Sequence, residues 1–168
     1  MSYELYLLRV PPGQQARAVL DRHFQSQEAE LNPGPSDPAK ETEKRRLATA
    51  LMQFDPGLSI AAFDFANMAA LEGIDENEAR RRYRHLELNS DDYSGIQITV
   101  WDDAAEISFP YWHSGEQAER VLLRVWDYLE VLEQSGKLTV YDPQLAQSLA
   151  LGFDFQTALQ HYARGGSR

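Results

Sequence analysis

The sequence contains no cysteine among its 168 residues. Disulfide bonds, thiolate metal sites and a cysteine nucleophile are therefore all excluded. No stretch approaches the roughly 18 consecutive apolar residues that a membrane-spanning helix needs, and the first residues lack the basic start and apolar segment of a secretory signal. We therefore expect a cytoplasmic protein that does not enter a membrane.

The local motifs of the large enzyme classes are also missing. The sequence has no phosphate-binding glycine loop, no GxSxG nucleophile elbow and no HExxH zinc motif. Its four histidines, His23, His85, His113 and His161, are far apart and show no metal-ligand spacing. We expect neither a metal nor a cofactor, and these absences favour binding over catalysis.

Basic residues are scarce and unevenly placed. The formal net charge is −10, and residues 85–119 contain eight Asp or Glu but no Lys or Arg. Such a segment repels phosphate backbones, so we do not expect a nucleic-acid partner. The one basic cluster, Arg80-Arg81-Arg82 with Arg84, falls on a predicted short helix. Because consecutive side chains spread around a helix, we expect these arginines to pair with nearby acids or to be solvated.

Hydrophobic periodicity predicts a mixture of strands and helices. Alternating apolar and polar residues predict strands over residues 85–89, 96–101 and 106–112. Short apolar stretches that end before prolines predict two more strands, over residues 3–9 and 138–141. Helical spacing predicts helices over residues 14–31, 38–54, 75–83 and 115–136. The last three are expected to begin at the capping residues Asp37, Asp75 and Ser114. The segment 58–73 is apolar without a clear period, so its structure is left open.

The order of these elements predicts an α+β fold: an antiparallel sheet of four to five strands with helices mainly on one face. Without the extra helices and the strand that begins at His85, it reduces to βαββαβ, the ferredoxin-like or split βαβ arrangement. Right-handed crossovers then place the first strand between the Glu106 strand and the last strand. We expect one domain over residues 1–168, with a helical insertion at about 32–83 and a tail helix at about 153–164.

The face of this sheet that points away from the helices carries an unusual set of side chains. Tyr6, Trp101, Glu106, Trp112 and Tyr141 belong to it, so aromatic side chains stand among carboxylates. Large aromatics with a polar group are typical of recognition surfaces. Two interpretations are open: the tail helix or a second copy of the chain covers this face, or the face binds a partner directly.

A second candidate site lies where the Glu106 strand and the last strand end at the same edge of the sheet. This edge gathers His113, Tyr141 and Asp142, of which His113 and Asp142 would act as a base and its orienting carboxylate. No nucleophile accompanies them, because Ser114 is expected to cap the following helix. A small enzyme or a small-ligand-binding site at this edge is the alternative to a protein-binding surface.

Three segments of the sequence resemble a family of small bacterial proteins. They are MSYELYLLR at the start, GIQITVWDDAAEISFPYW in the centre and LTVYDPQ near the end. The resemblance covers the strands and the last long helix, and it implies no activity because the family has none assigned. Some acidic proteins of this size and element order also look like immunity partners of bacterial toxins.

Charge and aromatic content together favour a non-enzymatic binding protein with a basic protein partner, as an immunity protein has. A homodimer is the other partner arrangement that the sequence leaves open. The binding residues that we expect are Tyr6, Trp101, Glu106, Trp112, His113, Tyr141 and Asp142.

Overall fold

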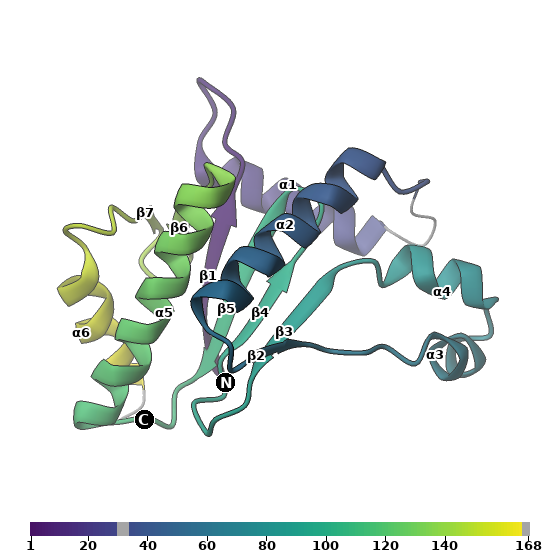
Figure 1. Cartoon of the computed structure of the whole chain (residues 1–168). Coiled ribbons are helices and arrows are strands. Elements are labelled where there is room, and N and C mark those ends of the chain that lie inside the picture. The colour runs from purple at the N-terminus through teal and green to yellow at the C-terminus, as the bar shows by residue number, and fades with distance from the viewer. Residues whose placement is uncertain (30–33, 166–168) are drawn as a thin grey trace.

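The computed structural model describes residues 1–29 and 34–165 (Figure 1). Within these residues the chain forms one antiparallel sheet of seven strands together with six helices, which confirms the α+β class. Residues 30–33 and 166–168 lie outside the described residues. The predicted domain span includes both segments, and the predicted helix 14–31 ends and the predicted helical insertion begins within the first of them.

The bounds of the elements are as follows. The strands are β1 (Ser2–Leu8), β2 (Leu58–Ile60), β3 (Leu86–Ser90), β4 (Gln97–Val100), β5 (Ala104–Pro110), β6 (Thr139–Asp142) and β7 (Gln147–Ser148). The helices are α1 (Ala16–Ala29), α2 (Pro38–Phe54), α3 (Phe65–Glu72), α4 (Glu76–Arg82), α5 (Gly115–Gly136) and α6 (Phe155–Gly165).

Two of the three predicted capping residues form a capping hydrogen bond at the start of their helix. The Asp37 side chain accepts a hydrogen bond from the Ala39 N–H at 2.9 Å, and Asp75 accepts one from the Glu78 N–H at 2.9 Å. Ser114 is the N-cap residue of α5 as predicted, but unlike the two aspartates its side chain makes no capping hydrogen bond. The segment 58–73, which the sequence left open, contains β2 and α3.

The strand order is β2-β3-β4-β5-β1-β6-β7. The sheet is thus larger than the four to five strands predicted, because the short strands β2 and β7 extend its two edges. As predicted, β1 lies between β5 and β6. The chain from β1 to β4 contains four helices and two further strands instead of one crossover helix, so this topology does not establish a ferredoxin-like arrangement.

β1 contributes to both faces of the sheet because its side chains alternate. It pairs with β5 over seven residues and with β6 through Tyr6, Leu7 and Leu8. Tyr3, Leu5 and Leu7 are fully buried in the main core. Tyr6 and Leu8 belong to a second, smaller cluster on the opposite face.

The main core lies between the sheet and the helices α2, α5 and α6 (Figure 1). The long helix α5 buries one apolar stripe, which consists of Val121, Leu122, Val125, Leu129 and Leu132. Helix α1 is the exception. It lies behind the sheet in Figure 1, and its residue Leu20 packs in the smaller cluster with Tyr6 and Leu8.

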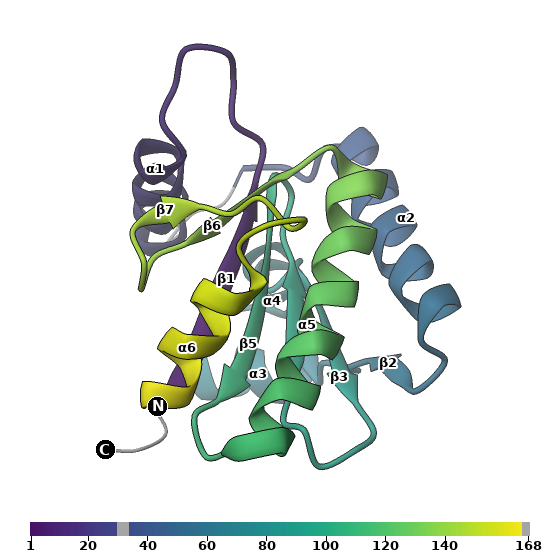
Figure 2. The same cartoon turned by 90° about the vertical axis from the view of Figure 1, so that its left-hand side faces the viewer.

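The tail helix α6 does not cover the face that points away from α5. Its residues His161 and Tyr162 place their rings 5.9 and 5.7 Å from the ring of Tyr3, on the side of the main core. Because β6 pairs only with the last three residues of β1, α6 occupies the space beside the earlier part of that strand (Figure 2).

A buried hydrogen bond joins β1 to β6. The carboxylate of Asp142 is fully buried and accepts a hydrogen bond of 2.5 Å from the Tyr3 hydroxyl. Its other oxygen accepts the backbone N–H groups of Gln144 and Leu145 at 2.8 and 3.0 Å. Burial, followed by this hydrogen bond, raises the pKa of Tyr3 far above its ordinary value, so the phenol stays a donor.

We expect Tyr3→Phe to lower the free energy of unfolding by about 1–3 kcal/mol, because a buried carboxylate oxygen then lacks its donor. Urea denaturation measures this change. The matched control is Tyr111→Phe, since the Tyr111 hydroxyl is partly exposed and makes no hydrogen bond within the described residues. Equal stabilities of the two variants would contradict this role of the Tyr3 hydroxyl.

Candidate functional site

The face of the sheet opposite the main core, here called the outer face, is only partly covered. Helix α1 seals one end of it, where Leu20 packs with Tyr6, Leu8, Ala104 and Tyr141. The helices α3 and α4 project beyond the edge of the sheet and pack mainly on each other (Figure 1). The part of the outer face away from α1 therefore remains open.

Two rows of side chains cross the outer face, from its open part to the end that α1 covers. From β3 to β1, the first row is Asn89, Gln97, Ser108 and Glu4. The second row is Glu87, Thr99, Glu106 and Tyr6. Directly opposed side chains in a sheet have their Cβ atoms about 5 Å apart, so each row is a continuous strip. Three carboxylates thus stand among neutral side chains.

No positive charge balances these three carboxylates. The seven strands contain neither Lys nor Arg. In residues 1–29 and 34–165, no basic group lies within ion-pair distance of Glu4, Glu87 or Glu106. All three are half-buried. Partial removal of a carboxylate from water without an opposite charge is unfavourable.

Two of these carboxylates accept hydrogen bonds from nearby side chains. Glu4 accepts from the hydroxyls of Ser2 at 3.0 Å and Tyr6 at 3.4 Å, and Glu87 accepts from the Asn89 side chain at 3.1 Å. These donors are neutral, so they orient the carboxylates without cancelling their charge. The outer face is consequently a negatively charged surface with polar side chains already in place.

The cost of ionising a partly buried carboxyl is clearest at Glu106. Burial, with a further contribution from the negative charge of Glu4, raises the pKa of Glu106 to about 7, and a hydrogen bond from Tyr6 opposes this rise only in part. The carboxyl is therefore poised between its neutral and charged forms near pH 7. A cation placed beside it would favour the charged form.

Three predicted aromatic residues lie at the covered end of the outer face. Tyr6 and Tyr141 are direct cross-strand partners, and both are buried beneath α1. Trp101 is half-buried against the same cluster. These side chains pack between the sheet and α1. They are therefore less accessible to a protein partner than Trp112, the remaining predicted aromatic residue.

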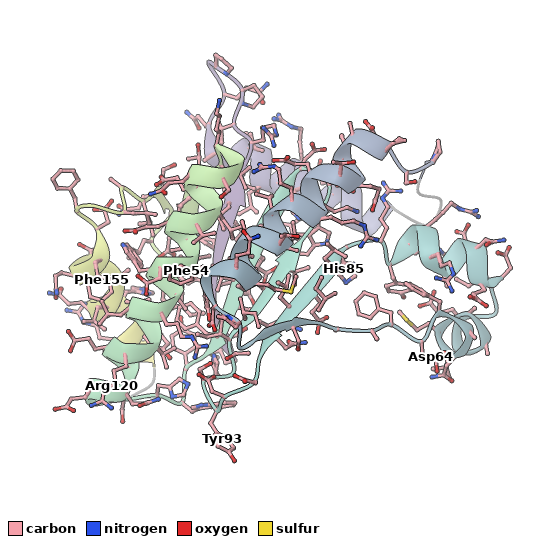
Figure 3. All side chains as sticks on the ribbon, viewed as in Figure 1. Phe54, Asp64, His85, Tyr93, Arg120 and Phe155 are labelled. Carbon is pink, nitrogen blue, oxygen red and sulfur yellow. The ribbon has the colours of Figure 1, made fainter. Side chains whose placement is uncertain are left out.

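Trp112 lies at the other, open end of the outer face and is 72 % exposed. It follows Pro110, which shares the outer face with Ser108 by strand alternation. Gly95 (φ 70°) lies close against both rings: a Cβ atom there would come within 2.9 Å of Pro110 and 3.2 Å of Trp112. Tyr93, in the same loop, points into solvent (Figure 3). An exposed indole thus borders the carboxylate rows.

The predicted edge site brings no base and carboxylate together. His113 is buried, and its Nε2 atom hydrogen-bonds the Ser94 carbonyl at 2.7 Å. Both carboxylate oxygens of Asp142 are used within the core, by Tyr3 and by two backbone N–H groups. Tyr141 points to the opposite face from Asp142, toward Tyr6.

Glu4 and Glu87 were not among the predicted binding residues. Their signal in the sequence is that each alternates with buried apolar neighbours in a strand that has no Lys or Arg. Across the described parts of the chain, no group of three or more His, Asp or Glu side chains is arranged to hold a metal ion. The same residues contain no helix with the length and apolarity to cross a bilayer.

No protein-family model, curated protein or solved structure matches the chain. The similarity of three sequence segments to small bacterial proteins therefore assigns no family, and the interpretation of the outer face rests on its geometry and chemistry.

We expect Glu106→Gln to change how stability depends on pH. A pKa near 7 in the folded state, above the ordinary value of 4.5, means that the folded protein loses stability as the pH rises between these values. Glutamine does not ionise, so the variant should be more stable than the wild type by about 1–3 kcal/mol at pH 8 and nearly equal at pH 4.

Urea denaturation at pH 4, 6 and 8 tests this expectation. Glu116→Gln is the matched control, because Glu116 is 88 % exposed on α5 and should show no such difference. Parallel pH curves for wild type and Glu106→Gln would show that the outer face does not hold Glu106 in an unfavourable charge state.

Proposed function

We propose that the protein is a non-enzymatic binding protein whose outer face receives a basic segment of another protein. The observation that carries this proposal is the set of three half-buried carboxylates, Glu4, Glu87 and Glu106, which form no ion pair with any basic group of residues 1–29 and 34–165. A Lys or Arg side chain of a partner would supply the missing charge and form charge-assisted hydrogen bonds.

The raised pKa of Glu106 supports the same proposal. In the free protein, ionisation of this carboxyl is unfavourable, since burial and Glu4 oppose it. A partner guanidinium within about 4–6 Å would reverse that balance, so binding near pH 7 is accompanied by release of a proton. Carboxylates that lack an opposite charge in the free protein gain one in the complex. This gain adds to the affinity for a basic partner and disfavours other partners.

Trp112 provides the apolar anchor of the proposed interface. An indole that is 72 % exposed loses much water-accessible area when a partner covers it, and Trp is among the residues that contribute most to protein–protein binding. It borders the carboxylate rows through Pro110 and Gly95. The proposed interface therefore combines a charged strip with one aromatic anchor.

The charge of the outer face also restricts the class of partner. Phosphate groups of a nucleic acid would meet three carboxylates, and a homodimer through this face would oppose like charges. A different, basic protein fits best, and a basic toxin held by an immunity-like partner is one such pair. We further propose that the chain is a single ferredoxin-like domain and that it acts in the cytoplasm. The edge with His113, Tyr141 and Asp142 offers no observation that favours an enzyme instead.

Photo-crosslinking tests this proposal directly. With p-benzoylphenylalanine in place of Tyr93, which is fully exposed in the loop beside Trp112, the protein should capture a basic protein from native cell lysate at low salt. Capture should fall at least tenfold at about 0.5 M salt, where the Debye length shrinks to a few ångströms. It should fall similarly when Glu4→Gln and Glu106→Gln are combined.

The control places the same crosslinker at Phe153, which is 89 % exposed in the segment before α6 and lies away from the outer face. Equal capture from both positions, or capture that is insensitive to the two glutamine substitutions, would overturn the proposal.

A further inference from the structure

A cleft of about 650 Å³ lies at the end of the sheet opposite Trp112. Its floor includes Leu8, Ala104 and Trp101, at the end of the β1–β5 pairing that α1 covers. One wall comes from α1, and the other from the link between α4 and β3. A neighbouring cleft of about 580 Å³ is lined by the same link, residues 83–85, and the two clefts are here together called the recess. This size is typical of small-molecule sites.

Aromatic rings line the recess in a connected series. The ring centroids of His23 and Trp101 are 4.8 Å apart, those of Trp101 and His85 6.3 Å, and those of His85 and Phe63 5.2 Å. His85 lies between the sheet and the α3–α4 pair (Figure 3). Burial lowers the pKa of both His23 and His85, so both imidazoles are neutral at pH 7. Such rings offer flat surfaces for a planar ligand.

Basic side chains line the same cleft although the whole chain is strongly acidic. Most of them are already paired: Arg84 with Asp102, Lys40 with Asp103 and Arg82 with Glu78. The arginines of α4 therefore pair with acids, as the sequence suggested.

Arg9 and Arg22 differ from these paired cations. Within the described parts of the chain, neither has a carboxylate at ion-pair distance, and Arg22 donates to the amide oxygen of Gln14. Both line the cleft, one from the end of β1 and the other from α1. Within the described residues, the cleft thus combines two guanidinium groups that form no ion pair with a wall of aromatic rings.

We propose that this cleft binds a small ligand in which a planar aromatic ring carries a phosphate group, the chemistry of a mononucleotide. The ring packs against Trp101 and His85, and the phosphate pairs with Arg9 and Arg22. Guanidinium groups match phosphate oxygens in charge and in paired hydrogen-bond geometry. Two guanidinium groups that form no ion pair within the described residues favour a dianion over a single carboxylate. This site does not depend on the protein-binding role of the outer face.

Titration of the ¹⁵N-labelled protein with AMP tests the proposal by NMR. The Trp101 indole N–H signal should shift and saturate, with a Kd between about 1 μM and 1 mM. Adenosine alone and inorganic phosphate alone should each bind at least tenfold more weakly, because each lacks one of the recognised parts. No shift at roughly 10 mM AMP, or equal binding of phosphate and AMP, would overturn the proposal.

Matched variants locate the phosphate. Arg9→Gln combined with Arg22→Gln should weaken AMP binding at least tenfold. Arg17→Gln is the control, since Arg17 lies on the same helix but pairs with Asp21 and lines a different depression. Equal affinity of the double variant and this control would overturn the assignment, provided that their ligand-free spectra show intact folds. Glu4→Gln should bind AMP as the wild type does, which separates this site from the outer face.

Discussion

The pairing of β1 with β5 over seven residues is the constraint on which the rest of the structure depends. In this register Tyr3, Leu5 and Leu7 face the main core, while Glu4 and Tyr6 face outward. A shift of one residue would exchange the two sets and place Glu4 in the core, so burial of the apolar set fixes the register. The set of side chains on the outer face of β1 and β5 follows from this alternation.

The same alternation creates a surface that is unfavourable in isolation. Packing of α1 at one end gives the sheet a second apolar contact. The rest of the outer face keeps three half-buried carboxylates that have no ion-pair partner in the part of the chain that the structure describes. Stability alone would favour neutral or basic residues at some of these positions. Local rules are most often broken at functional sites, which is why the outer face is the strongest candidate for recognition.

Much of the fold could be predicted from the sequence because strong patterns are local. Strand alternation around Ile98 and Ile107, the stripe of α5 and the Asp37 and Asp75 caps all specify their own elements. The strands β2 and β7 were missed because two or three residues carry no detectable period.

The candidate sites were less predictable. The direction in which α1 packs depends on long-range contacts of Leu20, which determine that Tyr6 and Tyr141 are buried while Trp112 is exposed. The cleft gathers Arg9, Arg22 and His85 from segments distant in sequence, and no local spacing reveals that they meet.

The most direct test is a ¹³C NMR titration of the Glu106 carboxyl, in the free protein and with a saturating lysine- and arginine-rich peptide. We expect a midpoint near pH 7 in the free protein, and we expect the peptide to move this midpoint to lower pH. A midpoint of the free protein at the ordinary value of a glutamate would contradict the proposal that the outer face binds a basic partner. A midpoint that the peptide does not change would contradict it as well.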